Sequence, residues 1–157
     1  MPGRTASDLQ PDTVARLAEL PGVVGIKEAT GNMCRASELI SRLGDRMAIL
    51  SGDDFTMFPL YALGGRGVIS VVSNVAPKAT AELWDAAVAG NWVRARELHY
   101  KLMPLVELLF QEPSPAPVKA ALSLAGKMSD ELRPPLYTVA PALRDKLRAA
   151  MLGAGLL

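Results

Sequence analysis

The chain has one cysteine, Cys34, and one histidine, His99, among its 157 residues. A single cysteine excludes an internal disulfide, and a single histidine excludes a histidine-rich metal site. No apolar run approaches the ~20 residues that a membrane-spanning helix needs. The first ten residues, MPGRTASDLQ, lack the apolar region of a secretory signal. These absences favour a cytoplasmic protein, although a secreted protein without disulfides would have the same composition.

Neither sign of charge is in excess, because 17 Lys and Arg residues nearly balance 16 Asp and Glu residues. The composition therefore gives no electrostatic reason to expect nucleic acid or a membrane as a partner. Aromatic residues make up only 5%, but half of all residues are hydrophobic. That content is enough for the core of one ordinary soluble domain. His99 lies in a helical pattern and is predicted to be structural.

The sequence contains a repeated unit, in which a short apolar run precedes an amphipathic stretch. The runs cover residues 22–27, 47–51 and 67–72. The first run is continuous and β-branched, which is typical of a strand buried on both faces. Strands that alternate with helices in this way are parallel and are joined by right-handed crossovers, which predicts an α/β fold.

Capping residues predict where the helices begin and end. Asn32 suits a helix N-terminus, and Gly44 lies where a C′ glycine would end that helix. The next helix is expected to begin near Thr56, and Pro77 suits the first turn of the one after it. A further helix is predicted ahead of these units, over residues 11–20.

From residue 91 onward the strand pattern stops and only helices are predicted. Pro104 predicts a kink in the first of them, and the proline-rich segment 112–117 separates it from the others. The three predicted helices cover residues 92–110, 118–125 and 140–152.

Lys27 closes the first apolar run, where ligands bind in parallel α/β folds. Apolar neighbours would disfavour the ammonium and lower the pKa of this amine. A neutral amine can attack a carbonyl, and the resulting iminium acidifies the adjacent carbon, which permits carbon–carbon bond chemistry without a metal. The alternative is a lysine paired with Glu28 or Asp53 at a solvated strand end, and spacing alone favours that alternative.

Three further positions are candidates on residue type. Arg4 could bind a carboxylate bidentately, although a solvated arginine is the simpler interpretation. Gly52 could let a substrate approach the backbone, or it could be only a turn glycine. Asp53 and Asp54 are better explained as capping residues than as an acid/base pair.

Six segments stand out, in order along the whole chain: 2–5 (PGRT), 25–32 (GIKEATGN), 50–54 (LSGDD), 64–70 (GGRGVIS), 113–119 (PSPAPVK) and 153–157 (GAGLL). Together, and with matching spacing, they resemble the dihydrodipicolinate synthase family, and the first is similar to the family's Asn-Val-Pro-x-Arg-Thr segment. The resemblance implies that Lys27 forms a Schiff base with pyruvate, and that Ile69 lines the pyruvate pocket through its backbone. It also implies that Arg4 binds the carboxylate of L-aspartate 4-semialdehyde, and that Gly52 and Asp53 form the turn beside this aldehyde.

The implied fold is a partial (β/α)8 TIM barrel, comprising the last three βα units, followed by a three-helix C-terminal extension. The barrel part is expected over residues 1–90 and the extension over 91–157. The implied reaction is an aldol-type condensation of pyruvate with L-aspartate 4-semialdehyde in lysine biosynthesis. It requires no cofactor or metal, because the iminium accepts the electrons. Full-length members of the family are expected to be homotetramers.

A complete barrel has eight strands and typically ~250 residues. By the resemblance, this chain starts after the fifth strand, so the family's Gly-Thr-x-Gly-Glu segment and its tyrosine and threonine proton relay fall outside it. We therefore expect the chain by itself to be inactive and unstable. Two alternatives remain: another class I aldolase that acts on a different 2-oxo acid, or a half-barrel without catalytic activity.

Overall fold

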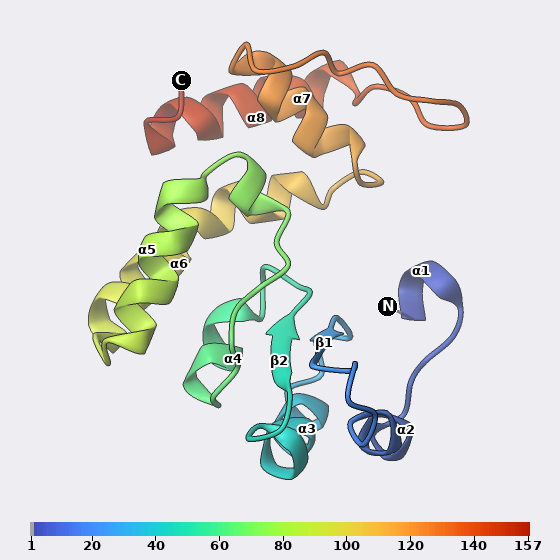
Figure 1. Cartoon of the computed structure of the whole chain (residues 1–157). Coiled ribbons are helices and arrows are strands. Elements are labelled where there is room, and N and C mark those ends of the chain that lie inside the picture. Colours follow the sequence, from blue (N-terminus) through green and yellow to red (C-terminus); the bar gives the residue numbers. More distant parts are fainter. Residues whose placement is uncertain (1) are drawn as a thin grey trace. The chain divides into compact units, whose positions relative to one another are not determined.

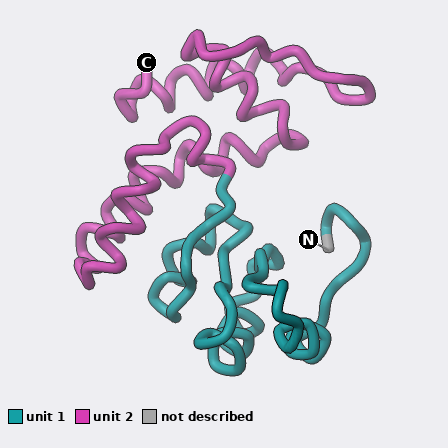
Figure 2. The backbone as a smooth tube through the Cα atoms, in the orientation of Figure 1, with its two compact units in different colours: residues 1–70 teal, residues 71–157 magenta. Residues whose placement is uncertain are grey.

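The computed structural model of the chain describes residues 2–157. The backbone divides into two compact units, which Figure 2 shows in different colours. The first unit ends at Ser70 and the second begins at Val71.

The first unit is built on two short parallel strands, β1 (Gly25–Glu28) and β2 (Ala48–Ser51) (Figure 1). Their register pairs Lys27 with Leu50. Helix α3 (Met33–Leu43) connects the strands, so this part of the chain is the βαβ unit that the sequence predicts.

The third apolar run, 67–72, does not form the strand expected from its composition. It pairs with β2 through a single parallel bridge between Ser51 and Val68. Gly67 has a φ of +143°, and the backbone at Val71 is already right-handed helical. Both conformations interrupt extended backbone, so pairing stops after Ile69 and the chain enters the 3₁₀ turn η1 (Val72–Asn74).

Helix α3 begins as predicted at Asn32, whose Oδ1 accepts hydrogen bonds from the backbone N of Cys34 at 3.0 Å and of Arg35 at 3.1 Å. The prediction for its other end is wrong in one respect. Gly44 ends the helix with a φ of −57°, which is right-handed backbone, so no left-handed glycine cap forms.

Three shorter helices complete the first unit. The helix predicted over 11–20 is shorter than expected and ends at Leu17, and the helix predicted near Thr56 begins directly after that residue. The helices are α1 (Pro2–Thr5), α2 (Pro11–Leu17) and α4 (Met57–Ala62).

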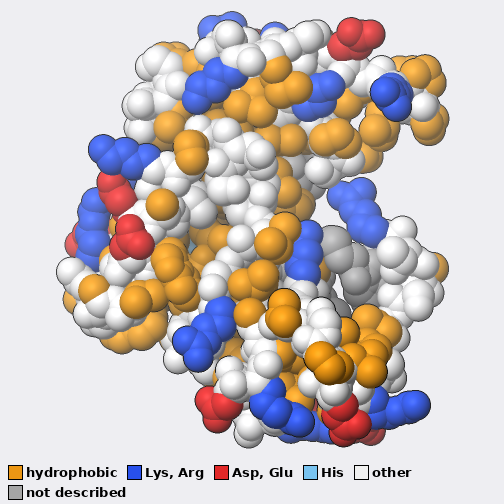
Figure 3. Space-filling view, in the orientation of Figure 1, with side chains coloured by type: hydrophobic (Ala, Val, Ile, Leu, Met, Phe, Trp, Pro, Cys, Tyr) orange, Lys and Arg blue, Asp and Glu red, His pale blue; other side chains and the backbone are white. Residues whose placement is uncertain are grey.

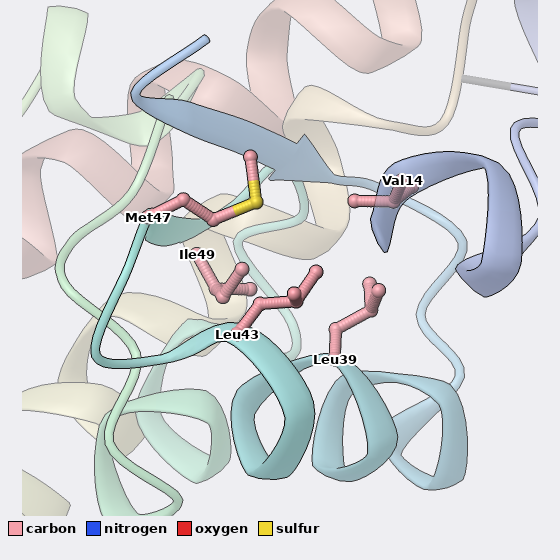
Figure 4. Packing of buried hydrophobic residues seen from close by; sticks show 5 residues of the cluster. All are labelled: Val14, Leu39, Leu43, Met47 and Ile49. Atoms are coloured by element: carbon pink, nitrogen blue, oxygen red, sulfur yellow. The ribbon is translucent and has the colours of Figure 1, made fainter. Parts of the chain in front are cut away.

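The core of the first unit lies between α2, α3 and β2. Its five buried side chains point toward one another in Figure 4: Val14, Leu39, Leu43, Met47 and Ile49. Leu39 and Leu43 are four residues apart, so both lie on one face of α3. This packing holds the crossover helix against the sheet and so fixes the strand that carries Lys27.

A Leu39→Ala substitution should lower the free energy of unfolding by about 2–5 kcal/mol, because Leu39 is 0% exposed and alanine leaves a cavity in the core. Urea unfolding followed by circular dichroism measures the change. Leu20→Ala is the matched control, because Leu20 is 53% exposed and should cost less than about 1 kcal/mol. Equal losses in the two variants would contradict the core assignment.

The second unit is helical, as the sequence predicts after residue 91. Helix α6 continues through Pro104, and α5 packs against α6, which explains why the compact unit begins at Val71. The division expected at residue 90, between barrel and extension, stays a prediction. The helices are α5 (Pro77–Val88), α6 (Trp92–Leu109), α7 (Ala116–Leu124) and α8 (Pro141–Ala154).

His99 is buried within α6, and this burial lowers the pKa of its imidazole. Its position in the core agrees with the structural role predicted for it.

Figure 3 shows acidic and basic side chains close together on the surface of the first unit, as the balanced composition suggests. No helix between residues 2 and 157 is long and apolar enough to cross a membrane.

Candidate functional site

Lys27 is the third residue of β1, and its half-buried side chain lies across the turn that follows β2. A Cβ atom added to Gly52 would be 2.5 Å from Cε of Lys27 and 2.8 Å from its Cγ. Two apolar segments of the lysine side chain therefore rest directly on the Gly52 backbone. The structure brings these two candidate residues into contact at the carboxyl ends of neighbouring parallel strands.

Gly52 continues the pairing of the two strands beyond their ends. Its backbone N donates to the carbonyl oxygen of Glu28 at 2.6 Å. A Cβ atom here would also be 2.5 Å from Cβ of Ala29, so the position has no room for a side chain on either side. Close packing explains this glycine, since its φ lies outside the left-handed region.

Asp53 organises the turn that leads into α4. Its Oδ1 accepts from the backbone N of Phe55 at 3.1 Å, and its Oδ2 accepts from the hydroxyl of Thr56 at 3.2 Å. The same Oδ2 is 3.4 Å from the point where a Cβ of Gly31 would stand, so the carboxylate also faces the loop after β1. These bonds give Asp53 a turn-forming role next to the lysine.

Asp54 is buried, with 1% of its surface exposed, and its charge affects the hydroxyl of Tyr61 in α4. Burial, and secondarily the charge of Asp54, raises the pKa of the Tyr61 hydroxyl well above its usual value. Burial and the neighbouring carboxylate thus both favour the neutral form of the phenol. The acid/base pair of Asp53 and Asp54, which was the less favoured interpretation of the sequence, stays a prediction.

Ile69 follows the single bridge of the third segment. Its backbone N donates to the carbonyl oxygen of Ser51 at 2.7 Å, which holds it beside the residue that precedes Gly52. Its side chain is 50% exposed. The structure thus places the Ile69 backbone at the same sheet end as Gly52, while the side chain stays outside the core.

Lys27 also borders a hollow of about 370 Å³ in the first unit, a size within the range of small-molecule sites. Four residues of the N-terminal segment line it: Thr5, Ser7, Asp8 and Leu9. Lys27 and Glu28 of β1 and Arg35 of α3 also line it. The other predicted site residues, Arg4, Gly52, Asp53 and Ile69, do not line it. Arg4 is exposed on α1, and its neighbour Thr5 reaches the hollow.

Among residues 2–157, no carboxylate lies within ion-pair distance of the Lys27 amine, although both Glu28 and Asp53 are close in sequence or space. The Glu28 carboxylate instead accepts from the backbone N and the hydroxyl of Thr30, at 3.0 and 2.7 Å. The alternative of a lysine neutralised by a strand-end carboxylate is therefore wrong for this structure.

Sequence reasoning missed a cluster of polar side chains beside Lys27. Glu28 is 7% exposed and lies 3.8 Å from Nε of Arg35, whose Nη1 donates to Asp8 at 2.7 Å. A glutamate at the end of a buried strand was the available signal, because a buried charge requires a partner. No cluster of three or more histidine, cysteine, aspartate or glutamate side chains suited to a metal occurs in the described part of the chain.

Known proteins match this chain over the segments that contain these candidate site residues. The sequence profile of the Dihydrodipicolinate synthetase family matches residues 1–153. The 4-hydroxy-tetrahydrodipicolinate synthase of Thermodesulfovibrio yellowstonii is 51% identical over 157 residues, which are 100% of this chain and 54% of the relative. The chain therefore spans about half the length of the curated relatives it matches.

Solved structures agree closely with the backbone. A dihydrodipicolinate synthase of Acinetobacter baumannii, described as chloride inhibited and in complex with pyruvate, superposes with a TM-score of 0.96 at 44% identity and covers 100% of this chain and 54% of its own. A monomeric dihydrodipicolinate synthase variant reaches 0.97 at 43% identity, with the same coverage of both chains. These matches confirm the expected fold class, part of a TIM barrel with a helical extension. The chain belongs to the dihydrodipicolinate synthetase family and corresponds to the C-terminal half of its members.

Proposed function

We propose that the chain carries the Schiff-base lysine of a lyase that condenses pyruvate with L-aspartate 4-semialdehyde. One observation supports this proposal above the others. The Lys27 side chain rests on Gly52 at the carboxyl ends of two parallel strands, and within residues 2–157 it has no ion-pair partner. An amine that is not held in an ion pair can react with the carbonyl group of a substrate in the adjoining hollow.

The proposed reaction proceeds through the amine of Lys27. The amine adds to the C2 carbonyl of pyruvate, and loss of water gives an iminium ion. Loss of a proton from C3 gives an enamine, whose carbon attacks the aldehyde carbon of the semialdehyde and forms the new C–C bond. The substrate's own amino group then attacks the iminium carbon, which closes the ring and releases the Lys27 amine. No metal or cofactor is needed, because the iminium accepts the electron pair.

The other candidates have supporting roles in this proposal. The backbone of Ile69 borders the pyruvate, and Gly52 and Asp53 form the turn that the aldehyde approaches. Arg4 binds the carboxylate of the semialdehyde with its guanidinium fork. Arg4 is exposed on α1, and its neighbour Thr5 lines the hollow.

The role of the chain in a larger assembly is also a proposal. The relatives it matches are about twice as long, and in the family the proton-relay residues lie in the half that this sequence does not cover. General acid–base assistance typically contributes 10² to 10⁴ in rate. We therefore propose that efficient turnover requires that half, and that the complete enzyme is a cytoplasmic homotetramer. One similar structure is described as a monomeric variant.

Trapping of a pyruvate adduct tests the proposal. The experiment uses a hybrid, in which the preceding part of the Thermodesulfovibrio yellowstonii relative is joined to the start of this chain. Incubation with pyruvate and borohydride, followed by peptide mass spectrometry, should place a reduced adduct on Lys27. Lys78, whose side chain is 90% exposed, is the internal control for unspecific reaction. For the chain by itself, trapping should be slower by on the order of 10² to 10⁴.

Two results would contradict this function. An adduct on Lys78 as abundant as on Lys27 would show that the reaction is unspecific. A folded hybrid without any adduct would favour the half-barrel that has no catalytic activity. The second candidate function, an aldolase for another 2-oxo acid, is favoured by the position of Arg4 outside the hollow lining. A substitution of Arg4 distinguishes it from the synthase.

A further inference from the structure

Arg35 connects three separate parts of the first unit. It lies in the first turn of α3, and its side chain is only 13% exposed. Its Nη1 donates to Oδ2 of Asp8 at 2.7 Å, and its Nη2 donates to the carbonyl oxygen of Leu9. Its Nε is 3.8 Å from Oε1 of Glu28, at the end of β1. One guanidinium thus joins the N-terminal segment, the crossover helix and the strand of Lys27.

The Glu28 carboxylate also holds the loop that follows Lys27. Oε1 of Glu28 accepts from the backbone N and the hydroxyl of Thr30, and that hydroxyl accepts from the backbone N of Asn32 at 3.1 Å. Asn32 in turn caps α3. These hydrogen bonds connect the end of β1 to the helix that carries Arg35. They and the ion pair between Arg35 and Glu28 therefore stabilise the same arrangement of strand, loop and helix.

The partners of Arg35 lie on the wall of the hollow beside Lys27. Asp8 and Leu9 border it from the N-terminal segment, and Glu28 borders it from β1. Thr5, the residue next to Arg4, lies on the same wall. The segment therefore reaches the lysine in an orientation that its ion pair with Arg35 holds.

We propose that Arg35, through Asp8 and Glu28, is a positioning residue that sets the distance between the segment carrying Arg4 and the amine of Lys27. The proposal rests on the proposed function. Pyruvate needs only the lysine, so loss of Arg35 leaves imine formation unchanged. The aldehyde needs the amine and the segment together, so loss of Arg35 weakens its binding.

An Arg35→Met variant of the hybrid tests this role. Methionine keeps an unbranched, apolar side chain and removes the three polar contacts. The KM for L-aspartate 4-semialdehyde should rise about tenfold to a hundredfold, while the rate of pyruvate trapping at Lys27 stays within about twofold. Asp8→Asn, which removes the opposite charge, should raise the same KM. Arg35→Lys should give a KM between those of the parent hybrid and of Arg35→Met, because a lysine ammonium keeps the charge but lacks the planar, forked donors of a guanidinium.

Arg42→Met is the matched control. Arg42 lies on the same helix and pairs with Asp12 at 2.8 Å and with Glu38 at 2.7 Å, away from the hollow. It should leave both KM and trapping unchanged. If Arg35→Met behaves like this control, or if it lowers trapping and aldehyde turnover equally together with the melting temperature, the positioning role is overturned. A parent hybrid that forms no pyruvate adduct overturns the proposed function as well.

Discussion

A Gly52→Ala substitution should slow formation of the pyruvate adduct at Lys27 by on the order of 100-fold or more. The new Cβ would be 2.5 Å from Cε of Lys27 and 2.5 Å from Cβ of Ala29. Neither distance is compatible with the sizes of two carbon atoms, so at least one group must move. The rate of borohydride trapping in the hybrid measures the effect.

The flexible lysine side chain is the group that yields most easily. Cε is near the end of a chain of rotatable bonds, whereas Ala29 is held by the loop after β1. The protein should therefore stay folded while the amine leaves its place beside the hollow. A displacement of about 1 Å is enough for a loss of roughly 10² when the reacting atoms must be aligned.

Two further variants separate displacement of the lysine from damage to the fold. Gly22→Ala is the matched control, because nothing lies within 4 Å of a Cβ at that position, and it should trap pyruvate normally. Gly52→Ala combined with Ala29→Gly removes the contact with the loop but keeps the one with the lysine, so it should remain slow. Full recovery in this double variant, or a normal rate in Gly52→Ala, would contradict the geometry.

The elements near the site were predictable where the signal is local. The apolar runs predict β1 and β2, and Asn32 predicts the start of α3, because strand burial and helix capping depend on residues next to one another in sequence. The turn at Gly52 follows from the same reasoning. The contact between Gly52 and Lys27 required one more step, that carboxyl ends of parallel strands meet at one edge.

Features that depend on distant parts of the chain were missed. The third run has the composition of a strand, but the backbone at Gly67 and Val71 limits it to one bridge. The ion pair of Arg35 with Asp8 joins residues 27 positions apart, and nothing in the local sequence at either end indicates its partner. Sequence patterns report which residues are buried, whereas the identity of a buried charge's partner depends on tertiary packing.

An Arg4→Met substitution in the hybrid should lower kcat/KM for L-aspartate 4-semialdehyde on the order of 100-fold, while pyruvate trapping at Lys27 is unchanged. Two charge-assisted hydrogen bonds between a guanidinium and a carboxylate together contribute about 3 kcal/mol, and each 1.4 kcal/mol is about tenfold. Pyruvate forms its imine before the aldehyde binds, so the first step does not involve Arg4. Steady-state kinetics with varied aldehyde and the trapping assay measure the two steps separately.

Arg16→Met is the control, because Arg16 is likewise an exposed arginine of the first unit, on α2. It should leave both steps unchanged. Arg4→Lys should recover only part of the activity, since a lysine ammonium keeps the charge but lacks the planar fork that binds both carboxylate oxygens. If Arg4→Met has the kinetics of the control, the guanidinium does not bind the aldehyde. The Schiff-base chemistry at Lys27 would then serve a substrate without that carboxylate, which is the other aldolase.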